Sequence, residues 1–216
     1  MVVMTLSEDA QQLWQTAKTL ALKSRAVSPQ ARTLPPLLYF TDPLRTPDPR
    51  PTVRGLPEGA GVVYRHFGAA NAADMARDLR QISRDNGLIL LIGLDYLLAQ
   101  DIGADGVHLP ERALDLAPDL RLSHPNWLIT GAVHTHKALE QAAALDACVL
   151  SPVFKAGGAS SAKADLGLEA FSALCTRAPC PAYGLGGITA MRAPLMLDTG
   201  ACGIAGVEAF DAAFGR

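Results

Sequence analysis

Two glycine turns near the end of the chain have the residue pattern of a phosphate-binding site. Residues 184–189 read GLGGIT and residues 203–208 read GIAGVE, so each short apolar run breaks into glycine and leads into a helix-like segment. Glycine lets the backbone approach a ligand closely, and the N–H groups that open a following helix face an anion. A phosphorylated small molecule is the expected ligand, with plain turn geometry as the alternative. The predicted backbone contacts are at Gly186, Gly187, Gly206 and Val207.

Cationic side chains stand where they could neutralise such a ligand. Arg65 ends an apolar run, His66 follows it, and residues 155–163 place Lys155 and Lys163 among glycine, alanine and serine. In barrel enzymes the residues that do chemistry lie at the carboxyl ends of strands. We predict that Arg65, Lys155 and Lys163 act catalytically on a phosphate or pyrophosphate and that His66 contacts the ligand. The alternatives are a salt-bridged arginine at the rim, a partly buried histidine and a surface loop without a ligand.

His108 and the four cysteines are further candidate reactive side chains. His108 is the sixth residue of the run GADGVHL at residues 103–109 and is predicted to contact the ligand, with a hydrogen-bonded structural histidine as the alternative. The cysteines show no CxxC or zinc-type spacing. Buried, reduced thiols are expected from them.

Composition excludes several classes of function. The chain has 216 residues, of which 49% are hydrophobic and 19% charged, and this suits one domain with a large core. The net charge is −2 and no Lys/Arg cluster occurs, which argues against nucleic-acid binding. No apolar run approaches the roughly 20 residues of a membrane helix, and residues 1–5 lack the pattern of a signal peptide. We expect a cytoplasmic protein without a membrane partner, and a homo-oligomer is among the open options.

The elements that must position these residues alternate between strand and helix patterns. The strand runs are almost continuously apolar, as parallel strands covered on both faces are. They predict a single (β/α)8 TIM barrel over residues 37–216, with a doubly wound open sheet as the alternative. Predicted strands cover residues 37–41, 61–65, 88–92, 106–109, 127–131, 147–150, 182–185 and 203–205. Predicted helices cover residues 69–85, 95–102, 135–144, 168–177, 190–197 and 207–214.

The two remaining segments precede and follow the first strand. Residues 5–24 read as a helix capped by Thr5 or Ser7, so residues 1–36 are predicted to form an N-terminal helical extension on the outside of the barrel. Residues 42–59 hold five prolines and are predicted to form a loop rather than a full helix.

Four passages, in order, resemble the thiamine phosphate synthase family, which includes the related thiazole tautomerases. Residues 38–42 (LYFTD) resemble its opening strand, and residues 103–109 resemble its most recognisable run. Residues 151–154 (SPVF) and 166–169 (LGLE) resemble the loop after strand six and the next helix, and the glycine turns resemble the phosphate-binding end. The resemblance covers residues 37–210. It implies a barrel that joins a pyrimidine pyrophosphate to a thiazole phosphate and releases pyrophosphate with Mg²⁺ bound.

The residues that the family uses toward its substrates are only partly matched. Its second strand carries Gln, Arg and Lys toward the pyrophosphate, and here Arg65 alone stands in its expected place. A family serine falls at Ala132, and the basic histidine of the tautomerases falls at Pro152. Glu208 stands where the family has serine, and its carboxylate would compete with a bound anion unless it points away.

The metal ligands depart from the family pattern as well. The Asn-Asp after strand three falls at residues 93–94, which read Gly-Leu, and Asp95 lies one position on. The second aspartate falls at Ala113, near Glu111. The Mg²⁺ that the resemblance implies would therefore be held by Asp95 and Glu111.

Three hypotheses remain open within the thiamine pathway. The chain is a synthase with rearranged contacts, a family member without synthase activity that binds or converts another phosphorylated small molecule, or a non-catalytic barrel. Each lost cation or carboxylate removes stabilisation of charge that develops in the reaction. A synthase assay separates the first hypothesis from the others, and stabilisation by a phosphorylated ligand separates the second from the third.

Overall fold

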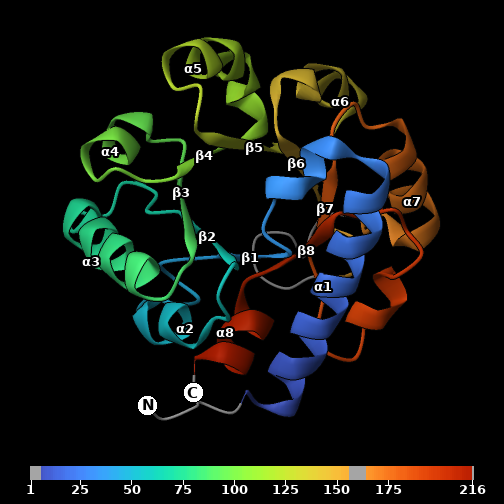
Figure 1. Cartoon of the computed structure of the whole chain (residues 1–216), viewed down its shortest axis with the longest axis horizontal. Coiled ribbons are helices and arrows are strands. Elements are labelled where there is room, and N and C mark those ends of the chain that lie inside the picture. Colours follow the sequence, from blue (N-terminus) through green and yellow to red (C-terminus); the bar gives the residue numbers. More distant parts are fainter. Residues whose placement is uncertain (1–5, 156–163, 216) are drawn as a thin grey trace.

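The chain folds into a closed barrel of eight parallel strands, each followed by a helical segment (Figure 1). The computed structural model describes residues 6–155 and 164–215. Each strand pairs with the next one along the chain, and β1 pairs with β8 to close the ring. The predicted (β/α)8 barrel is confirmed. The strands are β1 Leu37–Phe40, β2 Gly61–Tyr64, β3 Ile89–Gly93, β4 Gly106–Leu109, β5 Leu128–Val133, β6 Ala147–Leu150, β7 Ala182–Leu185 and β8 Gly203–Gly206.

Alternate residues of the strands face two separate apolar layers. Phe40, Val63 and Leu91 belong to a cluster inside the barrel, whereas neighbours such as Tyr39 and Val62 pack with the helices outside it. Because both faces are covered, the strands need apolar residues at almost every position. This is why their sequences showed continuous rather than alternating apolar runs.

A short connection closes the amino-terminal mouth of the barrel. The 3-10 helix η1 (Pro29–Thr33) and the residue after it bring Ala31 and Leu34 into the interior cluster. The buried hydroxyl of Tyr183 donates a hydrogen bond of 2.6 Å to the carbonyl of Pro35. The opposite mouth, at the carboxyl ends of the strands, is left for a ligand.

Helix α1 (Glu8–Val27) takes a place in the outer ring of helices. Ser7 caps it by accepting the N–H of Ala10, as predicted, and its buried face packs against β8, α8 (Glu208–Phe214) and the 3-10 helix η5 (Ala193–Met196). The helix predicted over residues 190–197 is wrong, because only η5 forms there. Pro194 lacks the N–H that a longer α-helix would use. The boundary at residue 36 between an extension and the barrel stays a prediction.

The other crossovers carry short helices. The loop predicted over residues 42–59 contains α2 (Arg50–Gly55), whose first turn accepts Pro51 because a proline N–H is not needed there. The segment after β4 forms the 3-10 helix η2 (Glu111–Leu116) and α5 (Ala117–Ser123), which the sequence reading did not predict. The remaining helices are α3 Ala72–Asp85, α4 Tyr96–Asp101, α6 His136–Gln141 with the 3-10 helix η3 Ala142–Ala144, and α7 Gly167–Arg177.

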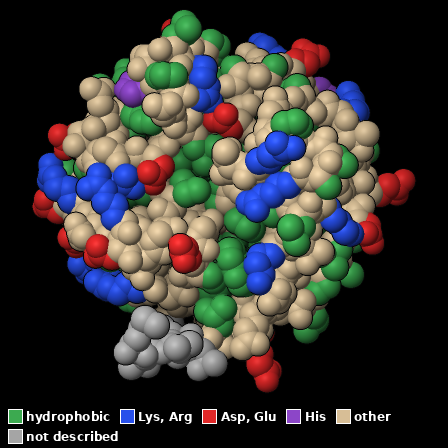
Figure 2. Space-filling model, viewed as in Figure 1, with side chains coloured by type: hydrophobic (Ala, Val, Ile, Leu, Met, Phe, Trp, Pro, Cys, Tyr) green, Lys and Arg blue, Asp and Glu red, His purple; other side chains and the backbone are tan. Residues whose placement is uncertain are grey.

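Charged side chains are scattered over the face of the molecule that Figure 2 shows. Basic and acidic side chains both lie around the apolar centre of this face, and several Lys and Arg side chains lie close together to the right of the centre. Among the described residues, no helix is both long enough and apolar enough to cross a membrane.

Replacing Leu20 by alanine tests whether α1 is part of the core. Its side chain is 1% exposed, so Leu20→Ala is expected to lower the free energy of unfolding by about 2–5 kcal/mol through lost burial and a cavity. Leu22 on the same helix is 67% exposed, and Leu22→Ala is expected to change stability by less than about 0.5 kcal/mol. Urea unfolding of both variants makes the measurement. Equal effects would contradict a core role for α1.

Candidate phosphate-binding site

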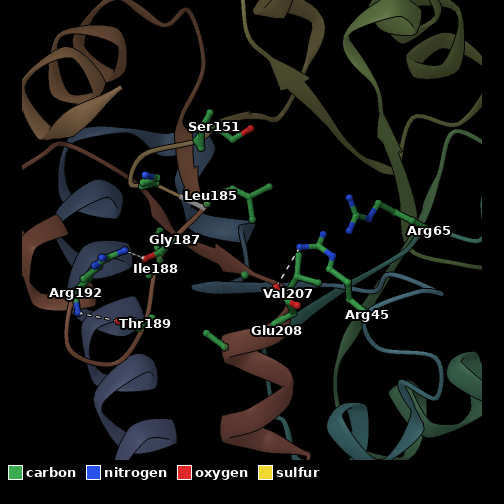
Figure 3. Close-up of a pocket in the computed structure, with 15 residues that line it drawn as sticks. Arg45, Arg65, Ser151, Leu185, Gly187, Ile188, Thr189, Arg192, Val207 and Glu208 are labelled. Atoms are coloured by element: carbon green, nitrogen blue, oxygen red, sulfur yellow. Dashed lines mark hydrogen bonds and ion pairs between the residues drawn. The ribbon is translucent and has the colours of Figure 1, made fainter. Parts of the chain in front are cut away.

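A cavity of about 330 Å³ opens at the carboxyl ends of β7 and β8 (Figure 3). It is bounded by the turn after β7, the turn after β8, the segment after β6 and the loop after β1. Both predicted glycine turns therefore line one cavity, although residues 190–202 separate them in the chain. The lining residues are Arg45, Arg65, Ser151, Pro152, Lys155, Leu185, Gly186, Gly187, Ile188, Thr189, Arg192, Gly206, Val207, Glu208 and Ala209.

The turn after β7 requires glycine at both of its central positions. Gly186 and Gly187 have φ values of +100° and +66°, which side-chain-bearing residues rarely adopt. A Cβ on Gly187 would lie 2.7 Å from the carbonyl oxygen of Lys155, and one on Gly186 would lie 2.7 Å from the Cβ of Pro152. The turn is thus packed tightly against the segment after β6.

Several backbone N–H groups in these turns have no hydrogen-bond partner among the described residues. Within residues 6–155 and 164–215, the N–H groups of Gly187, Ile188 and Thr189 make no hydrogen bond. The first N–H groups of α8 have no partner within their own helix, as at every helix start. Backbone N–H groups that face a cavity without a hydrogen-bond acceptor can donate to an anion with several oxygen atoms.

Arg65 reaches the cavity from the end of β2. Its Nε donates a 2.8 Å hydrogen bond to the carbonyl of Thr41, and its guanidinium lies over the rings of Phe40 and Phe67, at 5.3 and 5.4 Å from their centres. Burial lowers the pKa of Arg65 to about 10, which still leaves it charged near neutrality. Its buried Nη2 makes no hydrogen bond within the described chain and lies 3.8 Å from Asp42. The Arg65 side chain is therefore fixed in position, and its Nη2 is a hydrogen-bond donor that a ligand could use.

Two further arginines line the cavity, and the sequence reading missed both. Arg45 follows β1 and is bound through Nε and Nη2 to the carboxylate of Asp42, at 3.0 and 2.9 Å. Arg192 lies between the two glycine turns, and its Nη1 donates a 3.1 Å hydrogen bond to the carbonyl of Gly187. In Figure 3 the two side chains approach the cavity from opposite sides. In the sequence, both arginines lie a few residues after a predicted strand. Many surface arginines do so too, and the position therefore does not identify a ligand-binding residue.

The predicted lysines divide between described and undescribed residues. Lys155 lines the cavity, as the prediction requires, and follows the segment that packs against the β7 turn. Lys163 lies outside the described residues.

A second cavity of about 620 Å³ adjoins the first and shares Arg65 with it. The structure places His66 and His108 here rather than beside the glycine turns. His66 Nδ1 accepts the N–H of Gly68 at 3.1 Å, so Nε2 carries the proton that faces Asp95 at 3.4 Å. Both nitrogens of His66 thus have a partner in the protein, and its contact with a ligand stays a prediction.

His108 forms the floor of this second cavity. Its Nδ1 lies 3.0 Å from the hydroxyl of Thr130, and its ring meets Phe40 edge to face at 4.9 Å. Burial, together with the nearby charge of Arg65, lowers the pKa of His108 to about 3, so the imidazole is neutral near pH 7. It can offer a neutral hydrogen-bonding edge to a ligand, but it cannot supply a positive charge.

The carboxylates predicted to hold Mg²⁺ are bound elsewhere. Asp95 caps α4 and faces His66, and Glu111 accepts the N–H of His134 and, at 2.8 Å, the hydroxyl of Thr135. Across residues 6–155 and 164–215, no three side chains of His, Cys, Asp or Glu come together in a way that could hold a metal ion. Asp95 also lines the second cavity described above, whereas Glu111 does not. Ligation of Mg²⁺ by Asp95 and Glu111 stays a prediction.

Comparison with known proteins shows which family the chain belongs to. Residues 56–210 match the model of the family described as "Thiamine monophosphate synthase". The chain belongs to this family. The resemblance found in the sequence is therefore confirmed.

The relatives support the family at moderate identity. The chain is 30% identical over 164 residues to the thiamine-phosphate synthase of Laribacter hongkongensis, covering 74% of this chain and 78% of that one. It is 32% identical over 133 residues to the thiamine-phosphate synthase of Methanoculleus marisnigri, covering 61% and 63%. The solved thiamine phosphate pyrophosphorylase from Pyrococcus furiosus superposes with a TM-score of 0.65 over 83% of this chain and 87% of that one. At 23% identity, this last match shows the fold alone.

Alanine at Gly187 tests the tight turn. Gly187→Ala is expected to lower the free energy of unfolding by about 2–4 kcal/mol, because positive φ strain adds to a backbone clash. Gly59 is the matched control, since its φ is +82° but nothing lies within 4 Å of an added Cβ. Gly59→Ala should lose only the strain, about 1–2 kcal/mol. Urea denaturation gives both values, and equal losses would mean that the turn has room to relax.

The depressed pKa of His108 predicts a pH dependence of stability. The unfolded chain binds a proton at this residue below about pH 6.5 and the folded chain only near pH 3, so stability falls as the pH drops through this window. Between pH 7 and pH 5, wild type should lose about 2 kcal/mol more than His108→Gln. Unfolding curves at both pH values measure the difference. The exposed His136→Gln serves as control, and a wild-type slope shared by His108→Gln would refute the assignment.

Proposed function

We propose that this protein binds a phosphorylated small molecule of the thiamine pathway in the cavity at the carboxyl ends of β7 and β8. The observation that carries the proposal is the convergence of both glycine turns, with their unspent N–H groups, on one cavity with cationic walls. Membership of the thiamine monophosphate synthase family supports thiazole phosphate as the ligand. A cytoplasmic location and a homo-oligomeric state stay predictions.

The charge of the cavity suits a phosphate monoester. Four cationic side chains and one carboxylate line the described part of it: Arg45, Arg65, Lys155, Arg192 and Glu208. Charged donors to phosphate oxygens form hydrogen bonds about twice as strong as neutral pairs. A dianionic phosphate therefore gains more here than an uncharged analogue of the same shape.

The synthase reaction is the second candidate, favoured by the second cavity. Arg65 lines both cavities. A pyrimidine pyrophosphate bound in the second cavity would therefore place its leaving pyrophosphate beside the guanidinium of Arg65, next to the phosphate in the first cavity. Arg65 would hold the departing pyrophosphate, and neutral His108 would face the ring. The positions of the family's two metal-binding aspartates hold Leu94 and Ala113 here, so we derive no step through a metal.

Ligand-dependent melting tests the first candidate. Thiazole phosphate is expected to raise the melting temperature, with a stabilisation of about 2.7 kcal/mol when the ligand is at 100 times its Kd. The dephosphorylated thiazole alcohol should have little effect. Arg65→Gln should weaken binding roughly tenfold through loss of a charged hydrogen bond, whereas Arg77→Gln, in an exposed ion pair, should not. An equal response to phosphate and alcohol would contradict the proposal.

A synthase assay separates the two candidates. Thiamine phosphate formed from both substrates with Mg²⁺, and lost in Arg65→Gln, would establish the second candidate. Binding of thiazole phosphate without product at high protein concentration would leave the first. Neither binding nor product would point to a non-catalytic barrel.

A further inference from the structure

The carboxylate of Glu208 lines the first cavity, where we propose that a phosphate binds, and faces the guanidinium of Arg45. Its Oε2 is 3.4 Å from Nη1 of Arg45, and both residues line the cavity (Figure 3). The Glu208 side chain is 56% exposed, so this contact is weak and easily broken. Glu208 therefore places a negative charge at the wall of the cavity, beside the glycine turn after β8.

Arg45 is held in place by a different carboxylate, that of Asp42. Asp42 accepts the N–H groups of Leu44 and Arg45 at 3.0 and 3.2 Å in addition to the guanidinium. Burial tends to raise the pKa of Asp42, but these hydrogen bonds outweigh it and lower the pKa, so the residue stays ionised. Arg45 therefore keeps its position when Glu208 leaves, with Nη1 free toward the cavity.

The charges in this corner are balanced before a ligand arrives. Asp42 and Glu208 carry two negative charges, and Arg45 and Arg65 carry two positive charges. A phosphate that displaces Glu208 from Arg45 exchanges one weak carboxylate contact for a charged hydrogen bond to a more highly charged anion. The displaced Glu208 is already more than half exposed and can turn to solvent.

We propose that Glu208 occupies Arg45 in the empty cavity as a placeholder, and that a ligand phosphate takes its place, which makes Arg45 a phosphate-binding residue. This inference rests on the proposed function, because it assumes that a phosphate enters this cavity. It assigns a role to two side chains that the glycine turns alone do not explain. It also resolves the conflict between a carboxylate and an anion at the same turn.

Titration with inorganic phosphate, followed by calorimetry, tests the placeholder. Glu208→Gln is expected to tighten phosphate binding about three- to tenfold, because Arg45 is freed and a repelling charge is removed. In the Glu208→Gln background, Arg45→Gln should weaken binding tenfold or more, and Arg45→Lys should restore only part of it. If Arg45 merely neutralised Glu208, the double variant would bind as wild type does.

Matched controls come from ion pairs outside the cavity. Asp198→Asn removes a carboxylate that pairs with Lys23 at 3.0 Å, and Arg50→Gln removes an exposed guanidinium that pairs with Asp48 and Asp78. Neither should change phosphate affinity by more than about twofold at fixed salt. Melting curves show whether each variant folds. If Arg45→Gln does not fold, the phosphate affinity of Glu208→Gln alone shows whether removal of the carboxylate tightens binding.

The outcomes separate this inference from the proposed function. Phosphate binding by wild type with no gain in Glu208→Gln overturns the placeholder but leaves the cavity a phosphate site. Binding that appears only in Glu208→Gln supports the placeholder. No binding in wild type or in Glu208→Gln overturns both proposals. A crystal structure with phosphate on Nη1 of Arg45, and with Glu208 turned away, is the expected structural result.

Discussion

Closure of the barrel between β1 and β8 is the constraint on which the candidate site depends. The pairing of Leu38 with Ala205 and of Tyr39 with Gly206 joins the first strand to the last. It brings the loop after β1, with Asp42 and Arg45, beside the glycine turn after β8. Since all strands run parallel, every carboxyl end opens on the same mouth, and cations from four separate loops reach one cavity. The plug at the opposite mouth leaves this end as the place for a ligand.

Asp42 organises the charged part of that mouth. It binds two backbone N–H groups and the guanidinium of Arg45, and it lies 3.8 Å from that of Arg65. The carboxylate thus orients Arg45, whereas Arg65 is held by the carbonyl of Thr41 and by two aromatic rings. A buried cation without such support would carry the full cost of desolvation. The phosphate site that we propose and the loop after β1 therefore depend on the same hydrogen bonds of Asp42.

The two cavities of the mouth differ in chemistry, although Arg65 belongs to both. The first combines glycine turns with several cations, and the second combines neutral His108 with a closed pair of His66 and Asp95. Arg112 lines the second cavity as well, so both cavities hold arginines. The proposed synthase reaction places a phosphate in the first cavity and the pyrimidine ring beside His108 in the second. The carboxylates of Asp95 and Glu111 accept hydrogen bonds at a helix start and from the segment after β5. Family membership fixes the fold more firmly than it fixes the reaction.

The sequence by itself determined the barrel, its eight strands and the two glycine turns, because continuous apolar runs and glycine positions are local properties of the chain. It did not predict α2 or α5, which are short helices that start at prolines, and it overestimated the helix around Pro194. Only the tertiary structure decided which charges meet. Arg45 and Arg192 are unremarkable in sequence, and the sequence did not show that Glu208 would face Arg45. Strand pairing brings Arg45 and Glu208, more than 160 positions apart, to a distance of 3.4 Å. Such convergence depends on ring closure and rotamer choice, which no local pattern encodes.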